Sequence, residues 1–272
     1  MRILIALTYY SPHLSGLTVH VRRLAEGLAS RGHRITVIAS RHDRRLPLRE
    51  EIGGVGIVRV PVAARLGKGP VMPLYLPYAL PELRRSEVAV VNLPTSPSEA
   101  IALPLAARLA PRRPLAAIHH CDLQLGTGLF DRLVTRTVRL CNLSAARLAR
   151  RIVAYTADFA AASTVLRLFP EKVAVIPPPV DIPEPRPDAA DALRRRLAPA
   201  GGLLLGMASR FASEKGIEYL LEALPALRTR LGPIRIAFAG ECERVVGEAR
   251  YRARLQPLLA AAGESWVALG PL

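Results

Sequence analysis

The sequence predicts an α/β protein with two Rossmann-like domains, the second incomplete. Short apolar runs of strand length alternate with amphipathic runs of helix length, which is typical of βαβ units around a parallel sheet. Residues 177–187 hold six prolines in eleven residues and are expected to form an extended connector. The last residues, WVALGPL, contain an apolar run of strand length. The predicted domains are therefore residues 1–182 and 183–272.

The first domain is expected to begin with a strand at residues 2–7 and a helix at residues 19–31. Further strands are expected at 34–39, 56–60, 88–92, 115–119, 152–155 and 173–176, and further helices at 96–109, 129–151 and 157–168. Residues 72–83 contain three prolines, so an irregular loop or a broken helix is expected there. The second domain is expected to run helix 188–197, strand 203–208, helix 216–230, strand 234–239, helix 247–262 and strand 266–269.

Composition and charge argue against a membrane-spanning protein and against a nucleic-acid-binding protein. Hydrophobic residues make up 50% of the chain, yet no apolar run reaches the ~18 residues needed to span a bilayer. The net charge of +16 favours anionic partners such as phosphosugars or anionic membranes, while the 5% aromatic content argues against nucleic acid. Three scattered cysteines, no metal-ligand spacing and no signal-peptide cleavage site predict a reducing, cytoplasmic location and no bound metal.

The segment GLLLGMASRFASEKGIEYLLEAL, residues 202–224, is the most informative part of the chain. It predicts a buried strand, a polar loop and an amphipathic helix, with Arg210 and Lys215 where the strand passes into the helix. Ligands of open α/β sheets bind beyond the carboxyl ends of the strands, and a helix N-terminus favours anions. Because Arg and Lys bind phosphate oxygens, a diphosphate site is predicted. Two solvated loop cations are the alternative.

These residues carry a family resemblance. SRFASEKGIEYLLEAL resembles the G-R-(x)4-KG-(x)3-L-(x)2-A block of retaining GT-B glycosyltransferases, the large glycosyltransferase family 4, with Ser209 in place of the block's glycine. Three more segments resemble landmarks of that family in the same order: residues 9–40, IHHCDLQL, and KVAVIPPPVDI. In the last segment Pro178 and Pro179 replace the usual Asn or Leu and Gly. The resemblance runs over nearly all of the chain and implies the two-domain GT-B arrangement.

The resemblance also implies what each domain does. The first domain is the acceptor side, and the second is the partial nucleotide-sugar-binding domain. Members of the family continue to an E-(x)7-E segment, whose glutamates hold the donor sugar and the ribose, and the present sequence stops at WVALGPL before any such segment. We therefore expect a chain truncated within its nucleotide-binding domain and nearly inactive as a transferase on its own.

The remaining site candidates lie in the first domain. Gly16 is in the loop between the first strand and the first helix, and the resemblance implies that this loop faces the donor's phosphates; a plain β–α turn is the alternative. His119 and His120 follow an expected strand. Alignment of HHCD with the family's HSD segment places the functional histidine at His120, with Asp122 beside it. The implied role of His120 is a hydrogen bond to the donor sugar, while Asp122 alternatively caps the next helix.

The resemblance implies retaining transfer by front-face chemistry, since no carboxylate of the family is established as a nucleophile. Arg210 and Lys215 would stabilise the leaving diphosphate, which would itself deprotonate the acceptor hydroxyl. We accordingly assign His120, Arg210 and Lys215 to catalysis, and Gly16, Arg210 and Lys215 to the donor diphosphate. No cofactor or metal is expected beyond the nucleotide-sugar substrate.

The expected helix 129–151 has a mixed surface in helical projection. Phe130, Val134, Cys141, Leu148 and Ile152 lie on one side. The other side gathers five arginines, Arg132, Arg136, Arg139, Arg147 and Arg150, with Leu129, Leu133, Leu140 and Leu143 among them. Basic residues with interleaved leucines suit an anionic bilayer, so peripheral association with the inner face of the plasma membrane is predicted. An ordinary solvated outer face is the alternative.

The sequence thus favours a glycosyltransferase that moves a sugar from a nucleotide-diphosphate donor to a lipid-linked or polysaccharide acceptor with retention. The alternative is a non-catalytic, glycosyltransferase-like binding module or the acceptor-side half of a split enzyme. A Rossmann oxidoreductase is disfavoured because the G-x-G-x-x-G fingerprint is missing.

Overall fold

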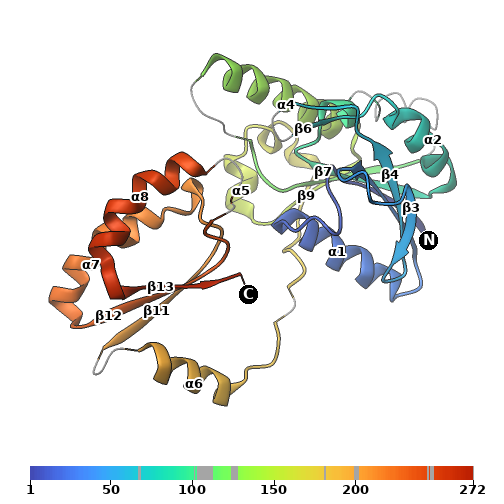
Figure 1. Ribbon diagram of the computed structural model, residues 1–272. Helices are drawn as coiled ribbons and strands as arrows, with labels where there is room; N and C mark the ends of the chain where they lie inside the picture. Colours follow the sequence, from blue (N-terminus) through green and yellow to red (C-terminus); the bar gives the residue numbers. More distant parts are fainter. Residues whose placement is uncertain are drawn as a thin grey trace. The chain divides into compact units, whose positions relative to one another are not determined.

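Two compact units make up the protein. The computed structural model describes residues 1–66, 69–100, 102, 113–123, 128–180, 182–198, 202–243, 245 and 248–271 (Figure 1). Residue contacts divide the chain into an N-terminal unit, Met1–Asp181, and a C-terminal unit, Ile182–Leu272. The described residues of the proline-rich connector form neither helix nor strand until Pro187, where a helix begins.

An eight-stranded sheet is the frame of the N-terminal unit, in the order β10-β9-β8-β7-β1-β2-β4-β3. Its neighbouring strands run parallel, except that β3 pairs antiparallel with β4 at one edge. The chain builds outward from β1 through β2 and β4, then returns to the other side of β1 at β7. The bounds are β1 Arg2–Ala6, β2 Arg34–Arg41, β3 Arg49–Ile52, β4 Val55–Pro61, β7 Val88–Leu93, β8 Leu115–His119, β9 Arg151–Ala154 and β10 Val173–Val175.

The strands predicted for this unit are confirmed, with small shifts at their ends. The sequence missed β3 and a two-stranded hairpin, β5 (Ala64–Leu66) with β6 (Gly69–Val71). The strand β3 was missed because its sequence, REEI, lacks an apolar pattern. Most of its residues are exposed at the edge of the sheet. Charged residues on an edge strand also hinder pairing with a second chain.

Helices cover both faces of this sheet (Figure 1). On one face α1 (Gly16–Ala29) buries Val21 in a cluster with β1, β2 and β4. On the other face α2 (Tyr75–Arg85), α4 (Leu129–Leu148) and α5 (Ala157–Ala162) contribute to the larger apolar cluster. Each fully buried Val, Leu or Ile side chain contributes about 1.5–3 kcal/mol. The two apolar clusters therefore stabilise the sheet and fix the positions of its strand ends.

Most of residues 72–83 lies in the helix α2, which begins at Tyr75, where the prolines predicted an irregular loop or a broken helix. The helix α2 accommodates Pro77 because it stands in the first turn, where the backbone N–H has no helical acceptor to lose. Pro81 stands inside the helix. Burial of Tyr75, Ala79 and Leu83 against the sheet offsets the hydrogen bond that Pro81 cannot make.

Two other helices are shorter than predicted. α4 ends at Leu148, because Arg151 already begins β9. The expected helix 157–168 is divided: α5 stops at Ala162, and a separate 3-10 turn follows at Leu166–Leu168. Most of the expected helix 96–109 lies outside the described residues.

The C-terminal unit is built on the parallel sheet β11-β12-β13 (Figure 1). Helices α7 and α8 pack together on one face, around a cluster that includes Ile217, Ile236 and Phe238. The sequence predicted the bounds of these elements closely, but the strand at residues 203–208, which was predicted to be buried, is only partly covered. Their bounds are α6 Pro187–Leu197, β11 Leu203–Ala208, α7 Ile217–Leu231, β12 Ile234–Ala239, α8 Ala249–Ala262 and β13 Trp266–Gly270.

Candidate functional site

The candidate site of the N-terminal unit lies where its parallel strands end. Loops after β1, β7, β8 and β9 emerge at this edge, and the strand order reverses between β1 and β7. A reversal of this kind is where open α/β sheets bind ligands. The polar side chains near these strand ends are His20, Asn92, Thr95, Glu99, His119, His120, Asp122 and Tyr155.

Neighbouring side chains fix the orientation of His120. The Asn92 amide donates from Nδ2 to the carbonyl oxygen of Ala6 at 2.9 Å, so its Oδ1 faces His120. The His120 Nε2–H donates to that oxygen at 2.8 Å, and Nδ1 accepts from the Tyr155 hydroxyl. Both ring nitrogens of a neutral His120 are therefore engaged, and a ligand must replace one of these partners to bond to the ring.

His120 stays uncharged at neutral pH. Burial, together with the neighbouring His20 and His119, lowers its pKa to about 3. The His20 ring meets the His120 ring edge-on at 5.1 Å between centroids. Neither ring nitrogen of His20 has a hydrogen-bond partner among the described residues. His20 is thus a site candidate that sequence reasoning missed, since nothing in the amphipathic pattern of α1 sets it apart.

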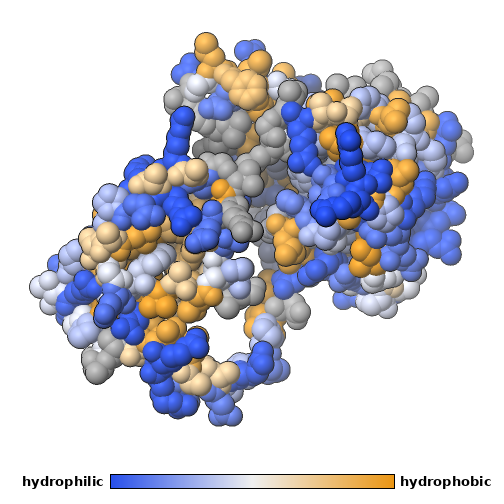
Figure 2. All heavy atoms as spheres, in the orientation of Figure 1, coloured by the Kyte–Doolittle hydropathy of each residue, from blue (hydrophilic) through white to orange (hydrophobic). Residues whose placement is uncertain are grey.

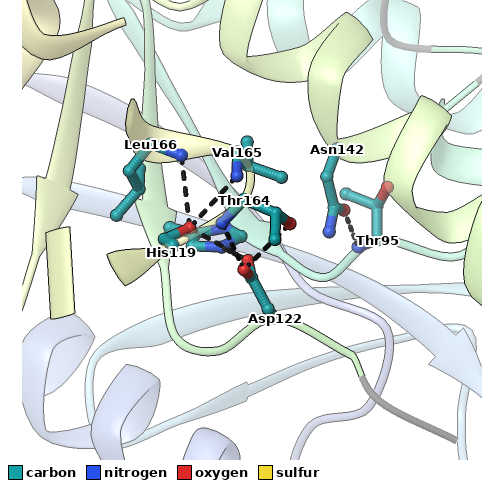
Figure 3. Close-up of polar contacts among 8 residues, drawn as sticks. Thr95, His119, Asp122, Asn142, Thr164, Val165 and Leu166 are labelled. Atoms are coloured by element: carbon teal, nitrogen blue, oxygen red, sulfur yellow. Dashed lines mark hydrogen bonds and ion pairs between the residues drawn. The ribbon is translucent and has the colours of Figure 1, made fainter. Parts of the chain in front are cut away.

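His119 has different partners from His120 and bonds to Asp122 (Figure 3). Its Nε2 donates to Asp122 Oδ1 at 2.7 Å, and its ring stacks on Phe159 with 5.8 Å between centroids. Burial lowers the pKa of His119 despite the nearby carboxylate, so the ring is neutral. The sequence placed Asp122 beside His120, whereas the structure pairs it with His119.

Asp122 fastens the loop after β8 to the turn after α5. It accepts hydrogen bonds from the Ser163 hydroxyl at 3.0 Å and from Thr164, through its N–H at 2.6 Å and its hydroxyl at 3.0 Å (Figure 3). Burial would raise the pKa of Asp122, but these bonds and the bond from His119 lower it. The alternative in which Asp122 caps the next helix is not seen, because α4 begins at Leu129 and its N-cap residue is Gly128, with no side-chain cap.

A capping box stands at the strand-order reversal. Glu99 accepts from the Ser96 N–H at 2.9 Å, and the Glu99 N–H donates to the Ser96 hydroxyl at 3.4 Å. Glu99 also accepts from Thr8 at 2.9 Å, which ties the loop after β1 to the loop after β7. Burial raises the pKa of Glu99. The spacing S-x-x-E is the sequence signal that could have found this pair.

A buried arginine holds the loop that leads to Gly16. Arg59 is fully buried in β4, forms an ion pair with Glu50, and donates to the carbonyl oxygen of Ser11 at 2.8 Å. Gly16 begins α1 after Ser15, whose hydroxyl accepts from the Thr18 N–H at 3.2 Å. A Cβ atom at Gly16 would meet nothing within 4 Å. The protein's own packing therefore does not demand glycine there.

In the C-terminal unit, Arg210 and Lys215 lie between the carboxyl end of β11 and α7, as the sequence predicted. Both are exposed, and Lys215 ends a 3-10 turn just before Gly216, whose φ of 64° is left-handed. Arg210 donates to Glu214 at 2.6 Å. Exposed pairs of this kind contribute at most about 1 kcal/mol, so an anion of higher charge can displace Glu214.

Next to these cations, the backbone after β11 lies very close to the backbone after β12. The Ser209 N–H donates to the carbonyl oxygen of Ala239 at 3.0 Å, and the Gly240 N–H donates to that of Gly270 at 2.8 Å. Gly240 has a φ of 152°, and a Cβ atom there would lie 1.8 Å from the Ser209 carbonyl oxygen. Only glycine fits this position, which the sequence analysis did not single out.

No group of His, Cys, Asp or Glu side chains in the described part of the chain is arranged to hold a metal ion. Within the same residues, no helix is long and apolar enough to cross a bilayer.

Residues 14–184 match the model of Glycosyltransferase Family 4. The chain belongs to this glycosyltransferase family. The matched range contains Gly16, His120 and Asp122, and it ends before Arg210 and Lys215. The family resemblance predicted from four short segments is therefore confirmed, while the roles of these residues stay predictions. Comparison with curated protein sequences gives no match.

Several solved structures share this fold. Sucrose-phosphate synthase from Thermosynechococcus elongatus has a TM-score of 0.74 at 17% identity, over 100% of this chain and 70% of that one. Anabaena HepE in complex with UDP and glucose has 0.71 at 18%, over 99% and 69%. WaaG, a glycosyltransferase involved in lipopolysaccharide biosynthesis, has 0.58 at 15%, over 99% and 70%. These likenesses confirm the predicted GT-B fold class.

Proposed function

We propose that this glycosyltransferase moves a sugar from a nucleotide-diphosphate donor to a lipid-linked or polysaccharide acceptor, with retention of anomeric configuration. The observation that carries the proposal is the position of Arg210 and Lys215, both exposed at the carboxyl end of β11 and directly before α7. In a chain of this family, two cations at a strand end ahead of a helix N-terminus suit a diphosphate.

The chemistry assigned to the cations is electrostatic. Negative charge grows on the diphosphate as the glycosidic bond breaks, and fixed positive groups lower the energy of that state. The diphosphate oxygen then takes the proton of the acceptor hydroxyl, while that hydroxyl's oxygen bonds to the anomeric carbon on the same face. Arg210 and Lys215 supply the positive charge, so the proposal needs no metal or other cofactor. We expect addition of EDTA to leave nucleotide affinity unchanged.

His120 and Gly16 take supporting roles in the proposal. A histidine with a pKa of about 3 does not transfer protons near pH 7, so His120 serves as a neutral hydrogen-bonding group for the donor sugar. The open space in front of Gly16 allows a phosphate to approach the N–H groups of α1. We therefore expect His120→Ala to depress turnover more than nucleotide affinity.

Donor binding is tested first with UDP, because solved structures with this fold are complexes with UDP, UDP-glucose and UDP-2-fluoro glucose. Calorimetric titration should show binding to the wild-type chain. Arg210→Ala and Lys215→Ala should each weaken it about tenfold, since one charge-assisted contact contributes about 1.5–3 kcal/mol. Arg230→Ala, an exposed arginine at the far end of α7, is the matched control. Wild-type affinity in both cation variants would remove the diphosphate assignment.

Turnover is a separate question. The expectation that these 272 residues alone transfer little or no sugar stays a prediction, and a panel of UDP-, GDP- and ADP-sugars with glycan and lipid-linked acceptors tests it. Product with the α-configured linkage of an α-configured donor would support retention. Nucleotide binding without any turnover would favour the binding-module alternative.

The lipid part of the proposal rests on the exposed surface of α4. Leu129, Leu133 and Leu140 are 86%, 63% and 61% exposed and lie on one side of the helix. Figure 2 shows hydrophobic side chains, with hydrophilic ones among them, over the end of α4 at the top of the view. Phe130 and Leu148, which the projection set on the opposite side, are exposed as well, at 63% and 41%. We name the set Leu129, Leu133, Leu140, Arg132, Arg136 and Arg147 the α4 outer face.

We infer that the α4 outer face lies on an anionic membrane surface. Each basic residue near such a surface contributes about 1 kcal/mol, and the exposed leucines add apolar contact. Flotation with anionic vesicles should fall steeply as salt rises, and neutral vesicles should bind little. The variant Arg132→Gln, Arg136→Gln, Arg147→Gln should release most of the protein. The control removes the same charge from three exposed arginines of α6, Arg194, Arg195 and Arg196. Equal loss in both would mean that net charge acts diffusely.

A further inference from the structure

Three aromatic rings pack against one another at the carboxyl edge of the N-terminal sheet. They belong to His20 of α1, His120 directly after β8 and Tyr155 directly after β9. The ring centroids of His20 and His120 are 5.1 Å apart, those of His20 and Tyr155 are 5.3 Å apart, and those of His120 and Tyr155 are 5.4 Å apart. Each ring therefore lies beside both of the others. We name these three side chains the ring triad.

One pair of the ring triad is joined by a hydrogen bond. The Tyr155 hydroxyl donates to Nδ1 of His120, and the other nitrogen of that ring, Nε2, donates to Asn92. His20 has both ring nitrogens buried, and neither bonds to a described residue. A neutral imidazole carries one donor and one acceptor, so His20 leaves one of each unused.

The unused nitrogens of His20 cost free energy in this state of the protein. Buried polar groups almost always have a partner, because an unpaired one has given up its hydrogen bonds to water. Burial also lowers the pKa of His20, which favours the neutral ring. A phenylalanine ring would occupy the same space without an unpaired nitrogen. The acceptor nitrogen of His20 is therefore of use only when a neighbouring donor turns to it.

Tyr155 is the donor in a position to turn. Burial raises the pKa of Tyr155, so its hydroxyl keeps the proton. One hydroxyl proton makes one hydrogen bond, and the Tyr155 ring is as close to the ring of His20 as to that of His120. A change of acceptor therefore requires reorientation of side chains, without movement of a strand.

This change of acceptor opens His120 to a ligand. The bond to Asn92 keeps the His120 proton on Nε2 and holds the ring in place, so Nδ1 stays an acceptor. When the Tyr155 hydroxyl donates to His20, Nδ1 is free to accept from a sugar hydroxyl. Both hydroxyl protons then have an acceptor, and neither histidine has to gain or lose a proton.

We propose that His20 is a positioning residue, which accepts the Tyr155 hydroxyl when a sugar hydroxyl binds to Nδ1 of His120. The inference rests on the proposed function, in which His120 bonds to the donor sugar. It adds a residue of α1 to the residues on which sugar binding depends. Without an acceptor at position 20, a bound sugar would leave the buried Tyr155 hydroxyl unpaired.

The first arm of the test measures the affinities of the full chain for UDP-glucose and for UDP by calorimetry. The ratio of the two affinities isolates the sugar contact. His20→Phe should lower this ratio about fivefold, because the displaced hydroxyl loses its acceptor, and should leave UDP affinity unchanged. His20→Gln keeps an acceptor oxygen and should restore most of the ratio. The control, His33→Phe, replaces a histidine directly before β2, at the opposite edge of the sheet, and should not change the ratio.

A second background distinguishes positioning from packing. Tyr155→Phe has no hydroxyl to displace, so adding His20→Phe to it should no longer change the ratio. An equal loss of the ratio with and without the Tyr155 hydroxyl would overturn the inference, since packing does not depend on that hydroxyl. Equal weakening of UDP and UDP-glucose by His20→Phe would overturn it as well.

The second arm needs no ligand. His120→Phe keeps a ring but removes its nitrogens, so Tyr155 is left with His20 as its acceptor. Hydrogen-exchange protection of β8 is then measured for a double-mutant cycle of His20→Phe and Tyr155→Phe. We expect a coupling of about fivefold in the His120→Phe background, and of less than about twofold with His120 present.

Failure of this inference is distinguishable from failure of the proposed function. No coupling in the His120→Phe background, in a chain that binds UDP through Arg210 and Lys215, overturns the change of acceptor and leaves the donor assignment standing. UDP-glucose that binds the wild-type chain no more tightly than UDP has the same meaning, because no sugar contact is then made. Coupling in a chain that binds no nucleotide would support the change of acceptor and overturn the donor assignment.

Discussion

Arg210 and Lys215 stand exposed beyond the end of β11, whereas His119 and Asp122 are packed beneath the corresponding edge of the N-terminal sheet. Of these two cations of the C-terminal unit, Arg210 forms one exposed ion pair, with Glu214. In the N-terminal unit burial lowers the pKa values of His119 and His120, and hydrogen bonds connect Asn92, His120 and Tyr155.

The two regions therefore differ in what their polar groups contribute: one contributes to ligand affinity, and the other to the stability of its unit. Exposed cations gain their strongest interaction only when an anion arrives, so they contribute to ligand affinity rather than to the stability of the unit. A buried, fully bonded network contributes to stability and sets positions before any ligand arrives. Substitutions at the N-terminal edge should therefore change stability first, and those at the C-terminal edge should change binding first.

The largest effect is expected from Asp122→Ala. It removes an acceptor of four hydrogen bonds and leaves the buried His119 Nε2–H unpaired, so the free energy of unfolding should fall by about 3 kcal/mol or more. Hydrogen exchange of peptides covering β8 measures this loss. Asp191→Ala, an exposed acid of α6, is the control and should leave β8 unchanged. Wild-type protection in Asp122→Ala would contradict the network.

Acidification should weaken the N-terminal unit next. Above pH 6.5 His120 is neutral in both states; below it the unfolded chain takes up a proton that the native state, with a pKa of about 3, refuses. The free energy of unfolding therefore falls as pH falls, by about 2 kcal/mol at pH 5 for His120, and His119 adds in the same direction.

Two probes distinguish the two units in this experiment. Hydrogen exchange at β8 reports the N-terminal unit, and the fluorescence of Trp266, the single tryptophan, reports the C-terminal unit. Protection at β8 should fall from pH 7.5 to pH 5, and His120→Asn should flatten that dependence. A steeper loss at Trp266 than at β8 would reverse the assignment.

A smaller, opposite effect is expected from Glu214→Gln. Its carboxylate competes with the diphosphate for Arg210, so its removal should raise UDP affinity about two- to threefold, in line with an exposed ion pair of a few tenths of a kcal/mol. Calorimetry against Glu222→Gln, an exposed glutamate of α7, checks it. Lower affinity in Glu214→Gln would mean that this side chain assists the ligand.

The smallest effect should come from removing both cations. The double variant Arg210→Ala, Lys215→Ala should change the free energy of unfolding by less than about 0.5 kcal/mol, because neither side chain is buried. Urea unfolding followed by Trp266 measures it. A loss comparable to that of Asp122→Ala would erase the contrast between the two edges.

Strand and helix periodicity predicted most of the fold because buried strands leave an apolar signal in sequence. It failed where that signal is absent or contradicted: β3 is exposed, and α2 tolerates Pro81 through its buried Tyr75 and Leu83. The positions of Arg210 and Lys215 were predictable because strand, loop and helix are consecutive in the chain.

The N-terminal network was not predictable in the same way. Asn92 lies in β7, whereas His120 and Tyr155 directly follow β8 and β9, and Asp122 bonds to Ser163 and Thr164 across a long stretch of chain. Such partners depend on sheet order, which periodicity does not encode. Only the Ser96–Glu99 pair left a local signature.

Gly240 has a consequence for laboratory evolution. Its backbone lies so close to the Ser209 carbonyl oxygen that any side chain would push the end of β11, and Arg210 with it, out of place. Position 209, by contrast, holds Ser where the family's motif has Gly, so this position tolerates a side chain. A library intended to change donor preference should therefore randomise Ser209 and keep Gly240 constant. Most codons at position 240 would encode a side chain that collides with the Ser209 carbonyl oxygen and displaces the end of β11.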